Sequence, residues 1–109
     1  MSAYSRIRQQ QLLQEAEGYL DLIRVTSWPT PLRRPYRRSL ALRAIAVLDQ
    51  ISPDQVAAAR VAYLRGQACR MMGRYRQAVE SLRRAVAADP ENLRTYLALG
   101  WCYKRVRRL

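Results

Sequence analysis

The sequence has no histidine and few acidic residues, and both shortages narrow the classes of function. None of its 109 residues is histidine, so the side chain best suited to proton transfer at neutral pH is missing. The four glycines form no phosphate-cradling loop. Carboxylates such as Glu15, Glu17 and Asp21 are more simply partners of nearby arginines. We therefore expect a non-enzymatic protein with no catalytic residues, no metal and no cofactor.

Cysteine is also scarce. Only Cys69 and Cys102 are present, and they do not form a close pair in the sequence. This spacing suggests neither a disulfide framework nor a metal knuckle. We expect buried, reduced thiols that pack in the core.

Long apolar runs are missing as well. No run of about 18 uncharged apolar residues occurs, and the start of the chain, MSAYSRIRQQQ, lacks the apolar core of a secretory signal. The length fits one small domain and is too short for two ordinary ones. These features predict a soluble, cytoplasmic protein without a membrane span.

Positive charge is what the sequence has in excess. The sequence has twenty basic and eight acidic residues, which gives a net charge of +12, and every basic residue except Lys104 is arginine. Eight carboxylates cannot neutralise this field, so an anionic partner is implied. An acidic protein, a nucleic acid or an anionic membrane face would each satisfy it.

Helical periodicity covers most of the chain. A long first helix is predicted from near Ser5, a proline-rich loop over 26–34, and a second helix from Pro35 to about Gln50. Ser52-Pro53-Asp54-Gln55 and Asp89-Pro90-Glu91-Asn92 each offer a capping oxygen and a proline at the first helical position. The apolar positions that define the first two helices are Ile7, Leu12, Leu13, Ala16, Leu20, Ile23, Leu40, Ala41, Ala44, Ile45, Val47 and Leu48.

A 34-residue spacing then marks a repeat, because Gly100 follows Gly66 at that interval. Residues 59–92 resemble the tetratricopeptide repeat, a stacking helix-turn-helix unit. The resemblance rests on residues that allow close helix packing, form the turn or mark a helix boundary: Gly66, Gly73, Tyr75, Ala78, Ala85, Asp89, Pro90 and Gly100. It implies an all-α fold of about five helices in a right-handed α-α superhelix.

A single domain over 1–109 is expected on this basis. Its parts would be a degenerate helical pair at 1–55, a complete repeat at 59–92 and the first helix of an incomplete repeat at 93–109. That last helix supplies Tyr96, Leu99, Gly100 and Tyr103, and no second helix follows in this sequence to cover it. Either the chain is a truncated member of a longer array, or another chain covers this helix. We expect this uncovered helix to self-associate or to dock a partner.

The resemblance also implies where a partner would bind. In this family the first helices of successive repeats line a concave groove that holds peptide segments. Matching the two repeats places the groove at Arg60, Tyr63, Leu64, Gln67, Arg70, Met71, Arg94, Leu97, Ala98, Trp101, Lys104 and Arg105. Positive charge at both ends and an aromatic middle suit an acidic peptide with apolar anchors.

A second basic cluster keeps a rival interpretation open. Arg33, Arg34, Arg37 and Arg38 bracket Tyr36, and arginines interleaved with aromatics suit single-stranded RNA. No recognition motif accompanies them. A protein or peptide partner is therefore favoured over nucleic acid.

Overall fold

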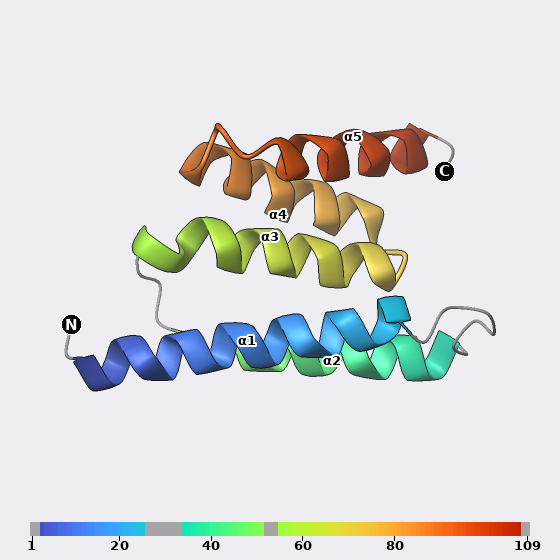
Figure 1. The fold of residues 1–109 in the computed structure, drawn as a ribbon. Helices are drawn as coiled ribbons and strands as arrows, with labels where there is room; N and C mark the ends of the chain where they lie inside the picture. Colours follow the sequence, from blue (N-terminus) through green and yellow to red (C-terminus); the bar gives the residue numbers. More distant parts are fainter. Residues whose placement is uncertain (1–2, 26–33, 52–54, 108–109) are drawn as a thin grey trace. The chain divides into compact units, whose positions relative to one another are not determined.

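The computed structural model describes residues 3–25, 34–51 and 55–107, and within these ranges the chain forms five α-helices and no strand (Figure 1). The helices are α1 (Ala3–Val25), α2 (Arg34–Asp49), α3 (Gln55–Met71), α4 (Tyr75–Ala88) and α5 (Leu93–Arg107). The predicted all-α helical-repeat fold is confirmed. The loop over 26–33 and the cap at Ser52-Pro53-Asp54 lie outside the described residues. No helix in the described ranges is both long and apolar enough to cross a membrane.

Two compact units divide the chain, Met1–Ser52 and Pro53–Leu109. In the first, α1 packs against α2 and runs antiparallel to it (Figure 1). Its buried apolar residues follow helical spacing, as predicted: Leu12, Leu13, Ala16, Leu20, Ile23, Ala41, Ala44, Val47 and Leu48. Ile7 was expected on this face, but it is 55% exposed. The prediction of one domain over 1–109, stacked as a right-handed superhelix, stays a prediction.

In the second unit, Gly73 turns the chain between α3 and α4. Its φ is +78°, a left-handed conformation that costs residues with a Cβ roughly 1 kcal/mol or more. The amide of Arg74 donates to the carbonyl of Cys69 at 2.9 Å, and the amide of Gly73 donates to that of Arg70 at 3.0 Å. These two bonds are the pair that defines a Schellman C-cap. The predicted end of the helix at Gly73 is confirmed.

Close packing joins α3 to α4 at Gly66. A Cβ atom added at Gly66 would lie 2.6 Å from Cγ of Leu82, so only glycine fits without displacing that leucine. Leu82 is fully buried, as are Ala78 and Ala85 on the same face of α4. Burying a leucine side chain contributes about 1.5–3 kcal/mol. The small residues of the repeat therefore let a large one fill the hairpin's core.

The start of α5 differs from the prediction. Asp89 and Pro90 were expected to begin this helix, but Asp89 is the C-cap of α4 and α5 begins at Leu93. Asp89 to Asn92 form a turn in which the amide of Asn92 lies 3.5 Å from the Asp89 carbonyl, with proline at the favoured second position. The side-chain oxygen of Asn92 accepts a 3.0 Å hydrogen bond from the amide of Arg94. Asn92, three residues later than expected, is therefore the cap.

Candidate protein-binding surface

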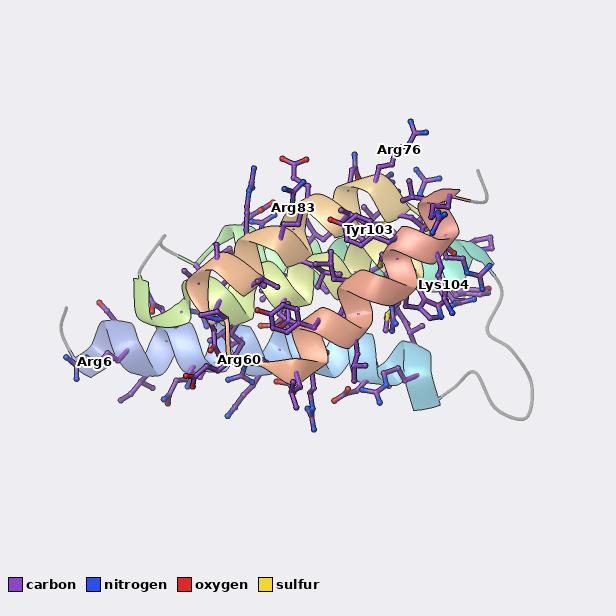
Figure 2. All side chains as sticks on the ribbon, turned by 90° about the horizontal axis from the view of Figure 1, so that it is seen from above. Arg6, Arg60, Arg76, Arg83, Tyr103 and Lys104 are labelled. Atoms are coloured by element: carbon purple, nitrogen blue, oxygen red, sulfur yellow. The ribbon has the colours of Figure 1, made fainter. Side chains whose placement is uncertain are left out.

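The predicted groove residues come from two helices that run in the same direction. Both α3 and α5 pack on α4, and they also approach each other; Figure 1 shows α4 antiparallel to both. Arg60 and Arg94 lie near the starts of α3 and α5, and Arg70 and Lys104 near their ends. Ten helical residues span about 15 Å. Positive charge therefore sits at both ends of the surface, as Figure 2 shows for Arg60 and Lys104.

Trp101 is the centre of the best-defined cluster on this surface. The residue is 39% exposed. The guanidinium carbon of Arg105 lies 4.7 Å from the ring centroid and that of Arg70 lies 5.1 Å away. Both distances fall within the range of cation–π attraction, worth about 0.5–1 kcal/mol at exposed sites. The indole therefore holds two arginines, one from each helix of the predicted groove.

Tyr75 belongs to the same cluster, although the sequence suggested only a structural role for it. Its ring centroid lies 5.7 Å from that of Trp101, at an interplanar angle of 59°. The guanidinium carbon of Arg105 is 5.9 Å from the tyrosine ring. We name Arg70, Tyr75, Trp101 and Arg105 the Trp101 cluster. Tyr75 begins α4, so the 34-residue matching of α3 with α5 gave no signal for it.

The middle of α3 contributes a polar pair. The amide nitrogen of Gln67 donates a 2.7 Å hydrogen bond to the hydroxyl oxygen of Tyr63. Both residues are half-buried, as is Met71 one turn after Gln67. The bond fixes the Tyr63 side chain along the helix, because residues four apart lie on one face.

Two residues predicted for the groove are instead part of the core. Leu64 is 5% exposed and Ala98 is 6% exposed, so neither is available to a ligand. Each lies on the side of its helix that packs within the unit. Their neighbour Leu97 is 75% exposed, which leaves it as the most accessible apolar residue of the predicted groove.

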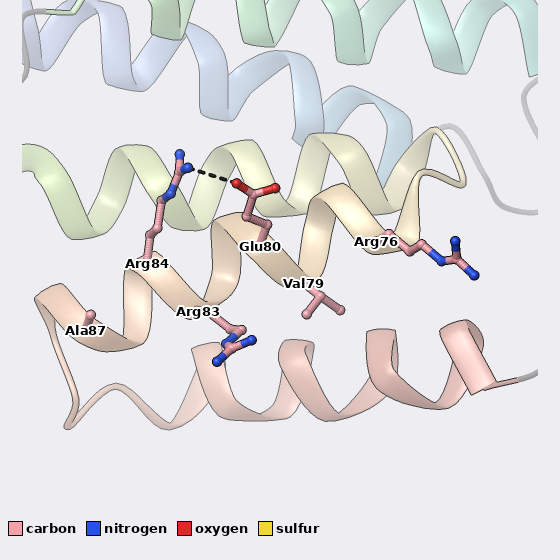
Figure 3. Close-up of a pocket in the computed structure, with 6 residues that line it drawn as sticks. All are labelled: Arg76, Val79, Glu80, Arg83, Arg84 and Ala87. Atoms are coloured by element: carbon pink, nitrogen blue, oxygen red, sulfur yellow. Dashed lines mark hydrogen bonds and ion pairs between the residues drawn. The ribbon is translucent and has the colours of Figure 1, made fainter.

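An open hollow follows α4 (Figure 3). It is lined by Arg76, Val79, Glu80, Arg83, Arg84 and Ala87. Arg84 and Glu80 form an ion pair at 2.9 Å, and both side chains are exposed, so the pair contributes little. This hollow is basic but contains no aromatic side chain, and it provides a matched surface for comparison with the Trp101 cluster.

The two cysteines are free and buried, as expected. Burial raises the pKa of the thiols of Cys69 and Cys102 above the ordinary 9.0, although nearby arginines act in the opposite direction. Neutral thiols are weak nucleophiles and weak metal ligands. In the described part of the chain, no cluster of three or more His, Cys, Asp or Glu side chains is placed to hold a metal ion.

The basic cluster that suggested nucleic acid is only partly described. Arg37 is half-buried and Arg38 is exposed, both on α2. Arg33 and the loop before it lie outside the described residues. The described residues therefore bring together no arginine–aromatic arrangement there comparable to the Trp101 cluster.

Antiparallel helices, a Schellman turn and a glycine-mediated contact at Gly66 define the class of this chain as a helical-repeat protein. Residues 59–92 match the family profile of the tetratricopeptide repeat, so the chain carries a repeat of this family and the resemblance is confirmed for that segment. Repeats of this family generally mediate protein–protein interactions and are typically non-enzymatic. Comparisons with curated proteins and with solved structures found no match.

Proposed function

We propose that this protein is an interaction scaffold that binds an acidic segment of a partner protein through α3 and α5. The ligand surface is made by Arg60, Tyr63, Gln67, Arg70, Met71, Arg94, Leu97, Trp101, Lys104 and Arg105. The observation that supports this proposal most strongly is the Trp101 cluster. It places two guanidinium groups, one from α3 and one from α5, within cation–π distance of a partly exposed indole.

Arginines held on an aromatic ring are well prepared to bind carboxylates. Stacking on Trp101 restricts the side chains of Arg70 and Arg105 before any ligand arrives, so less rotamer entropy is lost on binding. Their N–H groups remain in the guanidinium plane, where they pair with carboxylate oxygens in bidentate fashion. Tryptophan, tyrosine and arginine are also the residues that dominate binding energy at interfaces.

Apolar contact would come from the exposed side chain of Leu97 and the part of Trp101 that remains exposed. A ligand with carboxylates alone would leave both uncovered. We therefore expect a segment in which aspartate or glutamate residues alternate with a few leucine-like anchors. The exposed arginines and lysine toward the ends of the surface, Arg60, Arg94 and Lys104, would add long-range attraction and speed association.

A charge-reversal comparison tests the proposal. A fluorescent peptide of glutamates with two leucine anchors is titrated against the wild type, against R70E/R105E and against R76E/R83E. The last pair carries the same charge change on the α4 hollow. We expect the first variant to weaken binding by at least about tenfold, which corresponds to about 1.4 kcal/mol, and the second by much less.

Circular dichroism of each variant confirms that the helices remain. Equal weakening by both pairs would show that net charge alone drives binding and would contradict a specific site. A labelled single-stranded RNA in the same assay provides the other contrary outcome. If it binds more tightly than the peptide, with a steep loss of affinity as salt increases, phosphate contact is the better account.

A further inference from the structure

One face of α5 carries exposed apolar side chains in a single stripe. Leu93 is 75% exposed, Tyr96 is 44% exposed and Tyr103 is 42% exposed. Gly100 lies between the two tyrosines, and a Cβ added there would meet nothing within 4 Å. These four residues are three, four and three apart, which places them on one side of the helix. We name them the open face of α5.

The equivalent face of α3 shows what such a stripe is suited to hold. Thirty-four residues earlier in the sequence, the same positions are Ala59, Ala62, Gly66 and Cys69. At Gly66 the side chain of Leu82 from α4 fills the space above the backbone. Gly66 is buried, whereas Gly100 is exposed. The open face therefore has the glycine of a helix–helix contact, but no helix among the described residues covers it.

We propose that the open face of α5 docks an amphipathic α-helix of a partner protein, with a leucine seated against Gly100. The pattern of α4 supplies the geometry, since Ala78 and Ala85 lie four residues before and three residues after Leu82. Small residues at those two positions let helices approach to the lower end of about 8–10 Å. This second surface is independent of the peptide site, because its residues differ from those around Trp101.

The positive charge of α5 indicates which kind of helix would bind its open face. Between Leu93 and Arg107, α5 has four basic residues and no acidic one, and three of the four lie in its last turn. A partner helix with aspartate and glutamate flanking its apolar stripe would pair with these cations and neutralise them. The docked helix is therefore acidic on its flanks.

The same charges argue against a second copy of this chain as the occupant. Two α5 helices face to face would bring together eight cations with no carboxylate between them, and like charges across an interface are costly. The apolar stripe of α4 is not available either, because Ala78, Leu82 and Ala85 are already buried. A partner with an acidic amphipathic helix satisfies the apolar stripe and the charge together.

The test uses the full chain and a designed probe. The probe is a peptide of residues 75–88 in which Arg76, Arg83 and Arg84 are each replaced by glutamate, so that α4's apolar stripe is kept and the flanks are acidic. Its affinity is measured for the wild type, for G100L and for G18L. Gly18 lies on α1, where an added Cβ also meets nothing within 4 Å.

We expect G100L to weaken binding by at least about tenfold, because the new side chain occupies the space meant for the probe's leucine, and G18L to leave it unchanged. Equal binding by all three proteins would overturn the proposal. A scrambled peptide of the same composition reports on the Trp101 cluster instead. If R70E weakens binding of the scrambled peptide but not of the helical probe, the two surfaces bind their ligands separately, and each proposal is tested on its own.

Sedimentation of the chain without probe tests the remaining occupant. We expect a monomer at micromolar concentration, and the same for G100L. A dimer that G100L abolishes would assign the open face to a second copy and would contradict the charge argument.

Discussion

Three glycines of the second unit serve different purposes at the residue scale. Gly66 permits the close approach of Leu82, Gly73 supplies a positive φ at the Schellman cap, and Gly100 meets neither requirement in the folded chain. The 34-residue spacing predicts Gly66 and Gly100 as equivalents. Only the structure distinguishes the two glycines, because the spacing indicates a repeat but does not indicate whether a neighbouring helix packs against the glycine.

This difference predicts opposite effects of one substitution. Gly100→Ala should raise the free energy of unfolding by about 0.5–1 kcal/mol, since alanine favours the helix and meets no neighbour. Gly66→Ala should lower it by about 1–3 kcal/mol, because the Cβ displaces Leu82. Urea unfolding followed by circular dichroism measures both.

Gly18→Ala is the control for the helix-propensity gain, because Gly18 is also helical with open space around it. It should stabilise the protein as Gly100→Ala does. If Gly66→Ala were stabilising too, the 2.6 Å contact with Leu82 would have no energetic weight, and the close-packing account of the hairpin would be wrong.

At the scale of the helix, the start of α5 shows how two good capping sequences compete. Asp89-Pro90 and Asn92 both offer a side-chain oxygen near the helix start. The turn from Asp89 to Asn92 decides between them. It places Pro90 where its fixed φ fits, and it leaves the side-chain oxygen of Asn92 free to accept a hydrogen bond from the amide of Arg94. Sequence alone does not rank the two.

A pair of alanine substitutions checks this assignment. Asn92→Ala should lower the free energy of unfolding by about 0.5–2 kcal/mol, the usual cost of losing a side-chain cap. Asp89→Ala should cost less, because the bond that Asp89 makes at the end of α4 is through its backbone amide. Thermal or urea unfolding of the two variants gives the ranking. A larger loss for Asp89→Ala would restore the original prediction of the helix start.

Much of the fold was accessible from the sequence, because helical periodicity is a local property. The spacing correctly placed Leu12 and Leu20 in the core, yet it also placed Ile7 there, which is exposed. A periodic apolar stripe indicates which face of a helix is apolar, but it does not indicate how much of that face a neighbouring helix covers. The same limit applies to Leu93, whose exposed stripe has no partner helix in the described residues.

The candidate site was accessible in part, for a related reason. Repeat matching placed Arg70, Trp101 and Arg105 on one surface, and the structure brings them within cation–π distance. It did not identify Tyr75, because that contact depends on how α4 and α5 pack. Leu64 and Ala98 were assigned to the groove because each borders it, and burial within the unit is a tertiary outcome that matching cannot supply.

At the scale of the whole molecule, an excess of twelve positive charges has to be reconciled with a stable fold. The described surface shows ion pairs such as Arg84–Glu80 and arginines stacked on aromatic rings. Stacking shields the apolar ring but leaves the charge unneutralised. Binding of the proposed acidic partner would neutralise part of this charge and relieve the self-repulsion.

The most direct test of the proposed binding surface follows the indole N–H signals of the protein in a ¹⁵N-correlated NMR spectrum. The chain has two tryptophans, so the signal of Trp101 is compared with that of Trp28 in the same sample during titration with the acidic peptide. We predict that the Trp101 signal shifts with peptide, that the Trp28 signal does not, and that high salt reduces the effect. A shift at Trp28 with Trp101 unmoved would contradict binding at α3 and α5.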